Sequence, residues 1–144
     1  MNVSMDFARK FSLAYAALCR PLCRELELPQ TAFDILMFLA NNPEYRTAGD
    51  IVEVRGIKAN LVSVNVDKLV RDGYLRREPI ALDRRKTALV CTPLAEPIIA
   101  RGRALQQEFF ARLFAHTDEA MRAAFFQTIE IMRVDLDAII KEDH

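Results

Sequence analysis

Polar and basic side chains recur at helical spacing between residues 58 and 72, in a pattern that suits contact with an acidic polymer. At the pitch of an α-helix, Val62, Val66 and Leu69 fall on one side and form a stripe to be buried. The rest of the helix offers amide, hydroxyl and ammonium groups, which can bond to phosphates or to base edges. With Arg55 just before it, the candidate contact residues of this segment are Lys58, Asn60, Leu61, Ser63, Val64, Asn65 and Lys68.

A second group with the same chemistry lies at residues 83–86, where one carboxylate precedes three consecutive cations: Asp83, Arg84, Arg85 and Lys86. The flanking residues 74–77 and 87–92 read as two short strands around a polar tip at 81–86. We therefore expect a β-hairpin over residues 76–90 that carries these charges at its tip, which is the form of a wing.

Local signals predict the elements that hold the two groups in place. Thr47 can cap a short helix at 48–54, with Asp50 completing a capping box, and Gly56 makes the turn into the next helix. Gly73 then ends the helix at 58–72. This is the spacing of a helix-turn-helix.

Charge is concentrated on the same stretch. The chain of 144 residues has no net charge, yet residues 55–86 hold nine Lys or Arg against four Asp or Glu. A neutral protein would not be expected to bind nucleic acid, but the local excess of positive charge on the predicted helix and wing favours nucleic-acid binding.

The flanking segments predict long apolar helices. Residues 4–26, 93–115 and 117–144 carry large apolar side chains at helical spacing, beyond what a small winged domain needs for its core. We expect residues 1–28 and 93–144 to form a helical dimerisation region around a winged helix-turn-helix at 29–92, all within one continuous domain. A three-helix core within one chain is the alternative. The fold class is mainly α with a small β-wing.

Three short motifs carry a resemblance to a known family. The segment LVRDGYL at 69–75, then Asp83-Arg84-Arg85, then Leu89-Val90-Cys91-Thr92 resemble the winged-helix core of the MarR (multiple antibiotic resistance regulator) transcription factors. The resemblance extends over nearly the whole chain, since a helix before the core and two long helices after it also fit. Cys91 and Ala95 depart from the family pattern in a minor way. Leu61 and Val64, which stand where hydroxyl and basic side chains are common, leave the base preference open.

The resemblance implies a homodimeric, sequence-specific DNA-binding regulator, most simply a repressor. The helix at 58–72 would enter the major groove of double-stranded DNA at a palindromic operator, and the wing would enter the minor groove through Arg85, with Asp83 holding the loop or the arginine. Asn60 could then bond to adenine, while Leu61 and Val64 touch thymine methyl groups. Phosphate contacts are assigned to Arg55, Lys58, Lys68, Arg84 and Lys86.

Family members release DNA in response to a small apolar or phenolic molecule, an oxidant or a metal. An effector pocket could be lined by Phe7, Phe11, Phe38 and Phe110, although aromatic residues at this spacing are usually core. Cys19 and Cys23 could sense oxidants if neighbouring arginines stabilised their thiolates, but buried, inert thiols are the simpler reading. With two histidines in the chain and no ligand spacing, no metal or cofactor is expected.

Other functions remain as alternatives. A winged helix that binds a protein instead of DNA is the main one, because Leu61 and Val64 make the reading face partly apolar. An enzyme is not expected, since no phosphate loop, nucleophile motif or metal constellation is present. The sequence has no apolar run long enough to cross a membrane and no export signal, which predicts a cytoplasmic protein that does not bind membranes.

Overall fold

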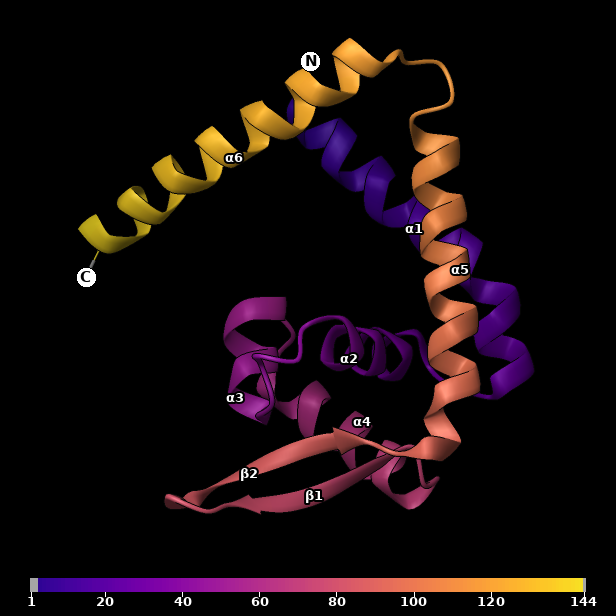
Figure 1. Cartoon of the computed structure of the whole chain (residues 1–144), viewed down its shortest axis with the longest axis vertical. Coiled ribbons are helices and arrows are strands. Elements are labelled where there is room, and N and C mark those ends of the chain that lie inside the picture. The colour runs from indigo at the N-terminus through magenta and orange to yellow at the C-terminus, as the bar shows by residue number, and fades with distance from the viewer. Residues whose placement is uncertain (1–2, 144) are drawn as a thin grey trace. The chain divides into compact units, whose positions relative to one another are not determined.

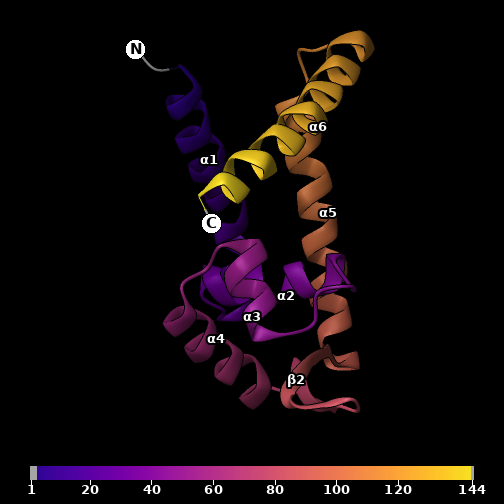
Figure 2. The ribbon, with the colours of Figure 1, turned by 90° about the vertical axis from the view of Figure 1, so that its left-hand side faces the viewer.

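The computed structural model describes residues 3–143, with helices throughout and one two-stranded antiparallel sheet, which confirms the predicted fold class (Figures 1 and 2). In chain order the elements are α1 (Val3–Leu26), α2 (Gln30–Asn41), α3 (Ala48–Asp50), the π-helical turn η1 (Ile51–Arg55), α4 (Ala59–Arg71), β1 (Leu75–Ile80), β2 (Asp83–Cys91), the 3-10 turn η2 (Pro93–Ala95), α5 (Glu96–Leu113) and α6 (Glu119–Glu142). The chain forms two compact units, which meet within α5 between Gln107 and Glu108.

The helix-turn-helix forms at the positions that the local signals predict. The Thr47 hydroxyl accepts the backbone N–H of Asp50, and the Asp50 carboxylate accepts the N–H of Thr47, so the predicted capping box is present. Gly56 has φ 79° and Gly73 has φ 87°, a left-handed conformation that glycine adopts at little cost. These two residues therefore separate α4 from the elements on either side.

The wing differs in length from the prediction. Its strands pair from Leu75 with Cys91 to Pro79 with Thr87, and Ile80 then pairs with Asp83. The tip is the two-residue turn at Ala81 and Leu82, so the expected polar tip at 81–86 is wrong. Three residues, 84–86, lie between the last two pairs on β2 with no counterpart on β1, which makes them an extended bulge.

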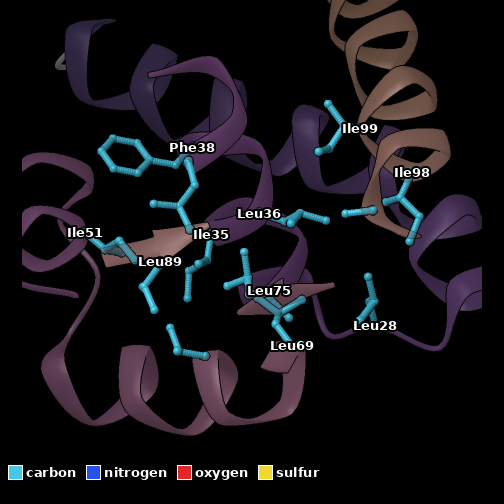
Figure 3. Packing of buried hydrophobic residues seen from close by; sticks show 14 of the residues in the cluster. Leu28, Ile35, Leu36, Phe38, Ile51, Leu69, Leu75, Leu89, Ile98 and Ile99 are labelled. Carbon is cyan, nitrogen blue, oxygen red and sulfur yellow. The ribbon is translucent and has the colours of Figure 1, made fainter. Parts of the chain in front are cut away.

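The winged region is built around one buried core, to which α5 also contributes. Figures 1 and 2 show α2, α3 and α4 grouped beside the hairpin. Ile35 and Leu36 of α2, Leu69 of α4 and Leu75 of β1 are almost completely buried in one cluster, which Ile98 of α5 also joins (Figure 3). The stripe predicted for the 58–72 helix therefore faces inward and turns the opposite face toward solvent.

The second half of α1 and the start of α5 pack against α2 in the same unit. Cys19, Leu22 and Cys23 of α1 form a smaller cluster with Phe33 and Met37 of α2. Gly102 of α5 is buried at this contact, because a Cβ there would overlap the side chains of Met37 and Phe33. The structure therefore requires a glycine here for close helix packing.

The second unit contains the end of α5 and all of α6. Phe114 packs against Phe125 and Phe126, with ring centroids 5.5 Å apart in both pairs. The cap of α6 is Asp118, whose carboxylate accepts the N–H of Met121 at 2.8 Å, one residue after Thr117, where the predicted range 117–144 begins. Thr117 instead donates its hydroxyl to the Phe114 carbonyl.

No residue of α6 is buried within the chain, although the helix carries ten exposed large apolar side chains. Those residues are Met121, Phe125, Phe126, Ile129, Ile131, Met132, Val134, Leu136, Ile139 and Ile140. Across residues 3–143, no helix combines the length and the hydropathy that crossing a bilayer requires.

Candidate nucleic-acid interface

The outward face of α4 presents a mixed polar and apolar surface. Asn60 and Ser63 are exposed at the start of the helix. Leu61 and Val64 beside them are 44% and 67% exposed, so methyl groups make up much of this face. Lys58 is the N-cap residue of α4, and its exposed side chain lies where the helix begins. The structure therefore brings these five sequence-predicted residues together on one surface.

Asn65 was placed on this face by the sequence analysis, and the structure corrects that. The side chain is 7% exposed, and its amide donates to the Leu61 carbonyl at 2.8 Å. A polar group in the core needs such a partner, because an unsatisfied donor there is costly. Asn65 therefore supports the helix from inside and does not reach a ligand in front of it.

Two of the predicted phosphate-binding cations are held by carboxylates. The Lys68 ammonium lies 2.9 Å from an oxygen of Asp72, and the side chain is only 29% exposed. Arg55 lies 3.5 Å from the Asp34 carboxylate of α2. The Lys68–Asp72 pair has the i, i+4 spacing that favours an ion pair on a helix, whereas Asp34, the partner of Arg55, comes from a different helix and could not be found from spacing. Both side chains keep part of their surface exposed, Arg55 at 43%, so a phosphate would compete with a carboxylate for each cation.

The wing places its cations on the bulge of β2. Arg84, Arg85 and Lys86 are all exposed. The Asp83 carboxylate accepts the backbone N–H of Arg85 at 3.0 Å, so it holds the backbone of the bulge in shape. Leu82, at the tip, is 100% exposed, and the sequence analysis did not single it out. Its position between a strand end and a charged run is the signal that could have marked it as a tip residue.

Several contacts fix the wing against the rest of the winged region. Arg77 of β1 pairs with Asp67 on the exposed side of α4. The N–H of Leu89 donates to the Arg46 carbonyl at 2.7 Å, and the Thr92 hydroxyl donates to the Gly73 carbonyl at 2.5 Å. These bonds join the wing to α4, to the loop before α3 and to the turn after α4, so they hold α4 and the wing in one unit.

Of the four aromatic residues predicted to line an effector pocket, three belong to the first unit and Phe110 belongs to the second. Phe38 lines a hollow of about 200 Å³ within the first unit, where it also stacks on Tyr45. Phe7 and Phe11 pair with each other on α1, and Phe110 stacks on Phe114 in the second unit. The hollow beside Phe38 is otherwise lined by Tyr15, Asp34, Met37, Asn41, Asn42, Arg55 and Gln106.

The sequence analysis missed the polar residues of this hollow. The Gln106 amide donates to the Tyr15 hydroxyl at 3.0 Å, which joins α5 to α1 at the rim. Burial raises the pKa of Tyr15 and also that of Asp34, although Gln30 and Arg55 partly offset the shift at Asp34. No spacing rule links these positions, since three helices far apart in sequence bring them together.

The two cysteines of α1 are buried, which supports the interpretation as inert thiols over the redox interpretation. Burial raises the pKa of the Cys23 thiol to about 11 and also raises the pKa of Cys19. Neither shift has a contribution from Arg20 or Arg24, the residues expected to stabilise thiolates. The thiolate is the reactive form, so both cysteines act as small core side chains. Within residues 3–143, no cluster of three His, Cys, Asp or Glu side chains could hold a metal ion.

The part of the chain that carries this surface matches a known family in sequence. Residues 26–86 match the sequence model of a family described as the MarR family. No curated protein matches the chain. The matched segment covers the helix-turn-helix and the wing as far as Lys86, which are the parts that carry the exposed polar face and the charged bulge.

Solved structures show the same fold over almost the whole chain. Transcriptional regulator PA3341 superposes with a TM-score of 0.81 at 26% identity, over 92% of this chain and 97% of that one. A MarR transcriptional regulator from Methanosarcina mazei Go1 gives 0.74 at 19% identity, over 94% and 95% of the two chains. BpsR of Bordetella bronchiseptica, whose DNA binding is regulated by 6-hydroxynicotinic acid, gives 0.70 at 16% identity, over 92% and 94%.

Proposed function

Because this chain belongs to the MarR family, we propose that it is a sequence-specific DNA-binding transcriptional regulator that works as a homodimeric repressor. One observation carries the proposal: the exposed polar start of α4 and the three-cation bulge of β2 belong to one winged region, in which Arg77 of β1 pairs with Asp67 of α4. Base edges and phosphates are the chemical partners that such a surface suits.

In the proposed complex the first turns of α4 enter the major groove. The Asn60 amide can pair with adenine, and Leu61 and Val64 can contact thymine methyl groups. Lys58 then reaches a phosphate at the N-terminus of the helix. The wing follows the backbone into the minor groove, where negative potential attracts the Arg85 guanidinium, with Arg84 and Lys86 on the flanking phosphates.

The proposed dimer is supported by the apolar surface of α6. Ten large apolar side chains exposed on one helix exceed what a monomer in water normally leaves uncovered. A second copy that covers them would present two winged regions related by a two-fold axis. The operator would then be a palindrome with half-sites about 10 bp apart, one turn of DNA.

We also place a small-molecule effector in the hollow beside Phe38. This hollow joins α1, α2 and α5 to Arg55, the last residue before the turn into α4. An apolar or phenolic molecule would meet the Tyr15 hydroxyl and the Asp34 carboxylate there, and could break the ion pair between Asp34 and Arg55. The regulation of BpsR by 6-hydroxynicotinic acid supports an effector of this size.

A protein-binding module is the second candidate, and the exposure of Leu61 and Val64 favours it. Fluorescence anisotropy with the DNA upstream of the gene separates the two functions. The regulator predicts tight binding that falls steeply with salt, because phosphate contacts release counterions. It also predicts much weaker binding to a shuffled duplex. Equal, weak binding to both duplexes would instead favour the protein-binding module.

A further inference from the structure

The closed end of the wing is apolar, although the tip of an exposed hairpin is usually polar. Residues 79–82 read Pro-Ile-Ala-Leu, with no charge among them. Leu82 is 100% exposed, and among residues 4–143 no other large apolar side chain is more than 71% exposed. In Figure 1 this end of the hairpin extends past α3 and α4. The leucine therefore projects from the winged region and adds nothing to its core.

The turn at the tip does not require a leucine. The common two-residue hairpin turns need a positive φ and therefore favour Gly, Asn or Asp. Within residues 3–143, Glu27 is the one non-glycine residue with a positive φ, so neither Ala81 nor Leu82 has one. The tip departs from those turn types, and its two residues are not ones that they select. Neither the local conformation nor packing within the chain explains the leucine.

The tip holds Leu82 at a fixed place beside the cations of the bulge. Pro79 restricts the backbone of β1 just before the turn. Ile80 pairs with Asp83 across the turn, and the Asp83 carboxylate accepts the backbone N–H of Arg85 at 3.0 Å. The wing thus ends in an apolar point that is followed directly by three exposed cations.

We propose that Leu82 is a wedge that enters a base step from the minor groove and kinks the duplex. Proteins that bend DNA through the minor groove insert apolar side chains between neighbouring bases in this way. The base stack supplies the apolar surroundings that the leucine lacks in water, while the cations of the bulge bind the phosphates beside it. The wedge rests on the proposed function, because the wing must first lie in the minor groove.

Such a wedge adds a sequence preference that needs no hydrogen bond to a base. Pyrimidine–purine steps such as TA and CA are the easiest to kink and unstack, so the cost of inserting a side chain is lowest there. We expect the operator to carry one of these steps where the wing lies, outside the bases that α4 contacts. Replacing that step by AA should weaken binding of the wild type and leave the affinity of Leu82→Ala unchanged.

Fluorescence of 2-aminopurine tests the wedge directly, because this adenine analogue brightens when it loses its stacking partners. The analogue is placed in turn at each adenine that the wing protects in the duplex upstream of the gene. With the wild type, fluorescence should rise at least about twofold at one step of each half-site. Leu82→Ala should lose most of this rise, whereas Leu82→Met, which keeps a long apolar side chain, should retain it.

Leu94→Ala is the matched control, because it truncates a leucine that is 60% exposed in η2 and lies outside the tip. Its complex should brighten as the wild-type complex does. Energy transfer between dyes at the two ends of the duplex measures the bend, which should be at least about 20° in the wild-type complex. The bend should be smaller with Leu82→Ala and unchanged with Leu94→Ala.

The wedge is wrong if the analogue stays dim in the wild-type complex, or if Leu82→Ala brightens and bends the duplex as the wild type does. Anisotropy of the same samples separates this result from failure of the proposed function. A wild type that binds its upstream duplex tightly without unstacking a base refutes the wedge alone. Equal, weak binding to the upstream and the shuffled duplex refutes the proposed function, and the wedge with it.

Discussion

The large apolar side chains of the winged region are mostly buried, whereas those of α6 are exposed. Ile35, Leu36 and Leu69 of the winged region are 0% exposed, whereas Leu136 and Ile140 of α6 are 57% and 58% exposed. The first region therefore gains its stability inside one chain. The second leaves a large apolar surface in water, and in the proposed function it serves assembly while the first serves recognition.

The largest effect is expected from charge on the apolar face of α6. The Ile129→Glu/Leu136→Glu variant should be monomeric at micromolar concentration, because both side chains would be buried between chains. Losing the second winged region should weaken operator binding by more than about 100-fold, since the two half-sites are then no longer bound together. Light scattering coupled to size exclusion gives the mass, and anisotropy gives the affinity.

Gln127→Glu is the control for this variant, because it adds a negative charge at an exposed polar position of the same helix. It should remain dimeric and bind DNA as the wild type does. If the double-Glu variant were still dimeric, α6 would not form the dimer interface, and the proposed difference in role between the two regions would be wrong.

A smaller effect is expected from a cavity in the winged region. Leu36→Ala should lower the free energy of unfolding by about 2–5 kcal/mol, the usual cost of truncating a fully buried leucine. Urea unfolding measures this change. Leu82→Ala removes the same atoms at the fully exposed wing tip and should change the free energy by less than about 0.5 kcal/mol. Similar losses for both would mean that Leu36 is not part of a packed core.

Local signals explain which parts of the winged region were predictable. The cap at Thr47 and the turns at Gly56 and Gly73 depend on residues close in sequence, and all three are found where the sequence placed them. The buried face of α4 was predictable from helical periodicity, because Val62, Val66 and Leu69 all fall on one side of the helix. The helix-turn-helix and its boundaries could therefore be predicted before any tertiary contact was known.

The remaining features depend on tertiary contacts that the sequence does not display. Asn65 lies near the border of the two faces of α4, and only the packing of the core turns it inward. The bulge on β2 follows from strand register, which residue types alone do not set. Likewise, the pairing of Arg55 with Asp34 joins η1 to α2, so sequence spacing could not show that this cation is already engaged.

An intermediate effect is expected at the wing. Arg85→Ala should weaken operator binding about tenfold, or about 1.4 kcal/mol, as the loss of a guanidinium from the minor groove would. Arg85→Lys retains the charge and should recover part of the affinity. Anisotropy at one fixed salt concentration measures both variants. Wild-type affinity in the alanine variant would remove the wing from recognition.

The smallest effect is expected at the cap of the helix-turn-helix. Thr47→Ala removes the hydroxyl that accepts the Asp50 N–H and should cost about 1 kcal/mol of stability. Thr128→Ala is the matched control, because its exposed hydroxyl only donates back to the Ala124 carbonyl within α6. Thermal unfolding should show a lower midpoint for the first variant only. Equal midpoints would mean that the capping box adds nothing to the winged region.

The central claim is that two chains assemble through α6 and bring two winged regions to the same DNA. The stoichiometry of the operator complex tests this claim most directly. Light scattering or sedimentation of the protein with a duplex of its own upstream region gives the mass of the complex. We predict two chains on one duplex, with protection of two half-sites about 10 bp apart. A complex of one chain per duplex, with a single protected half-site, would contradict the account.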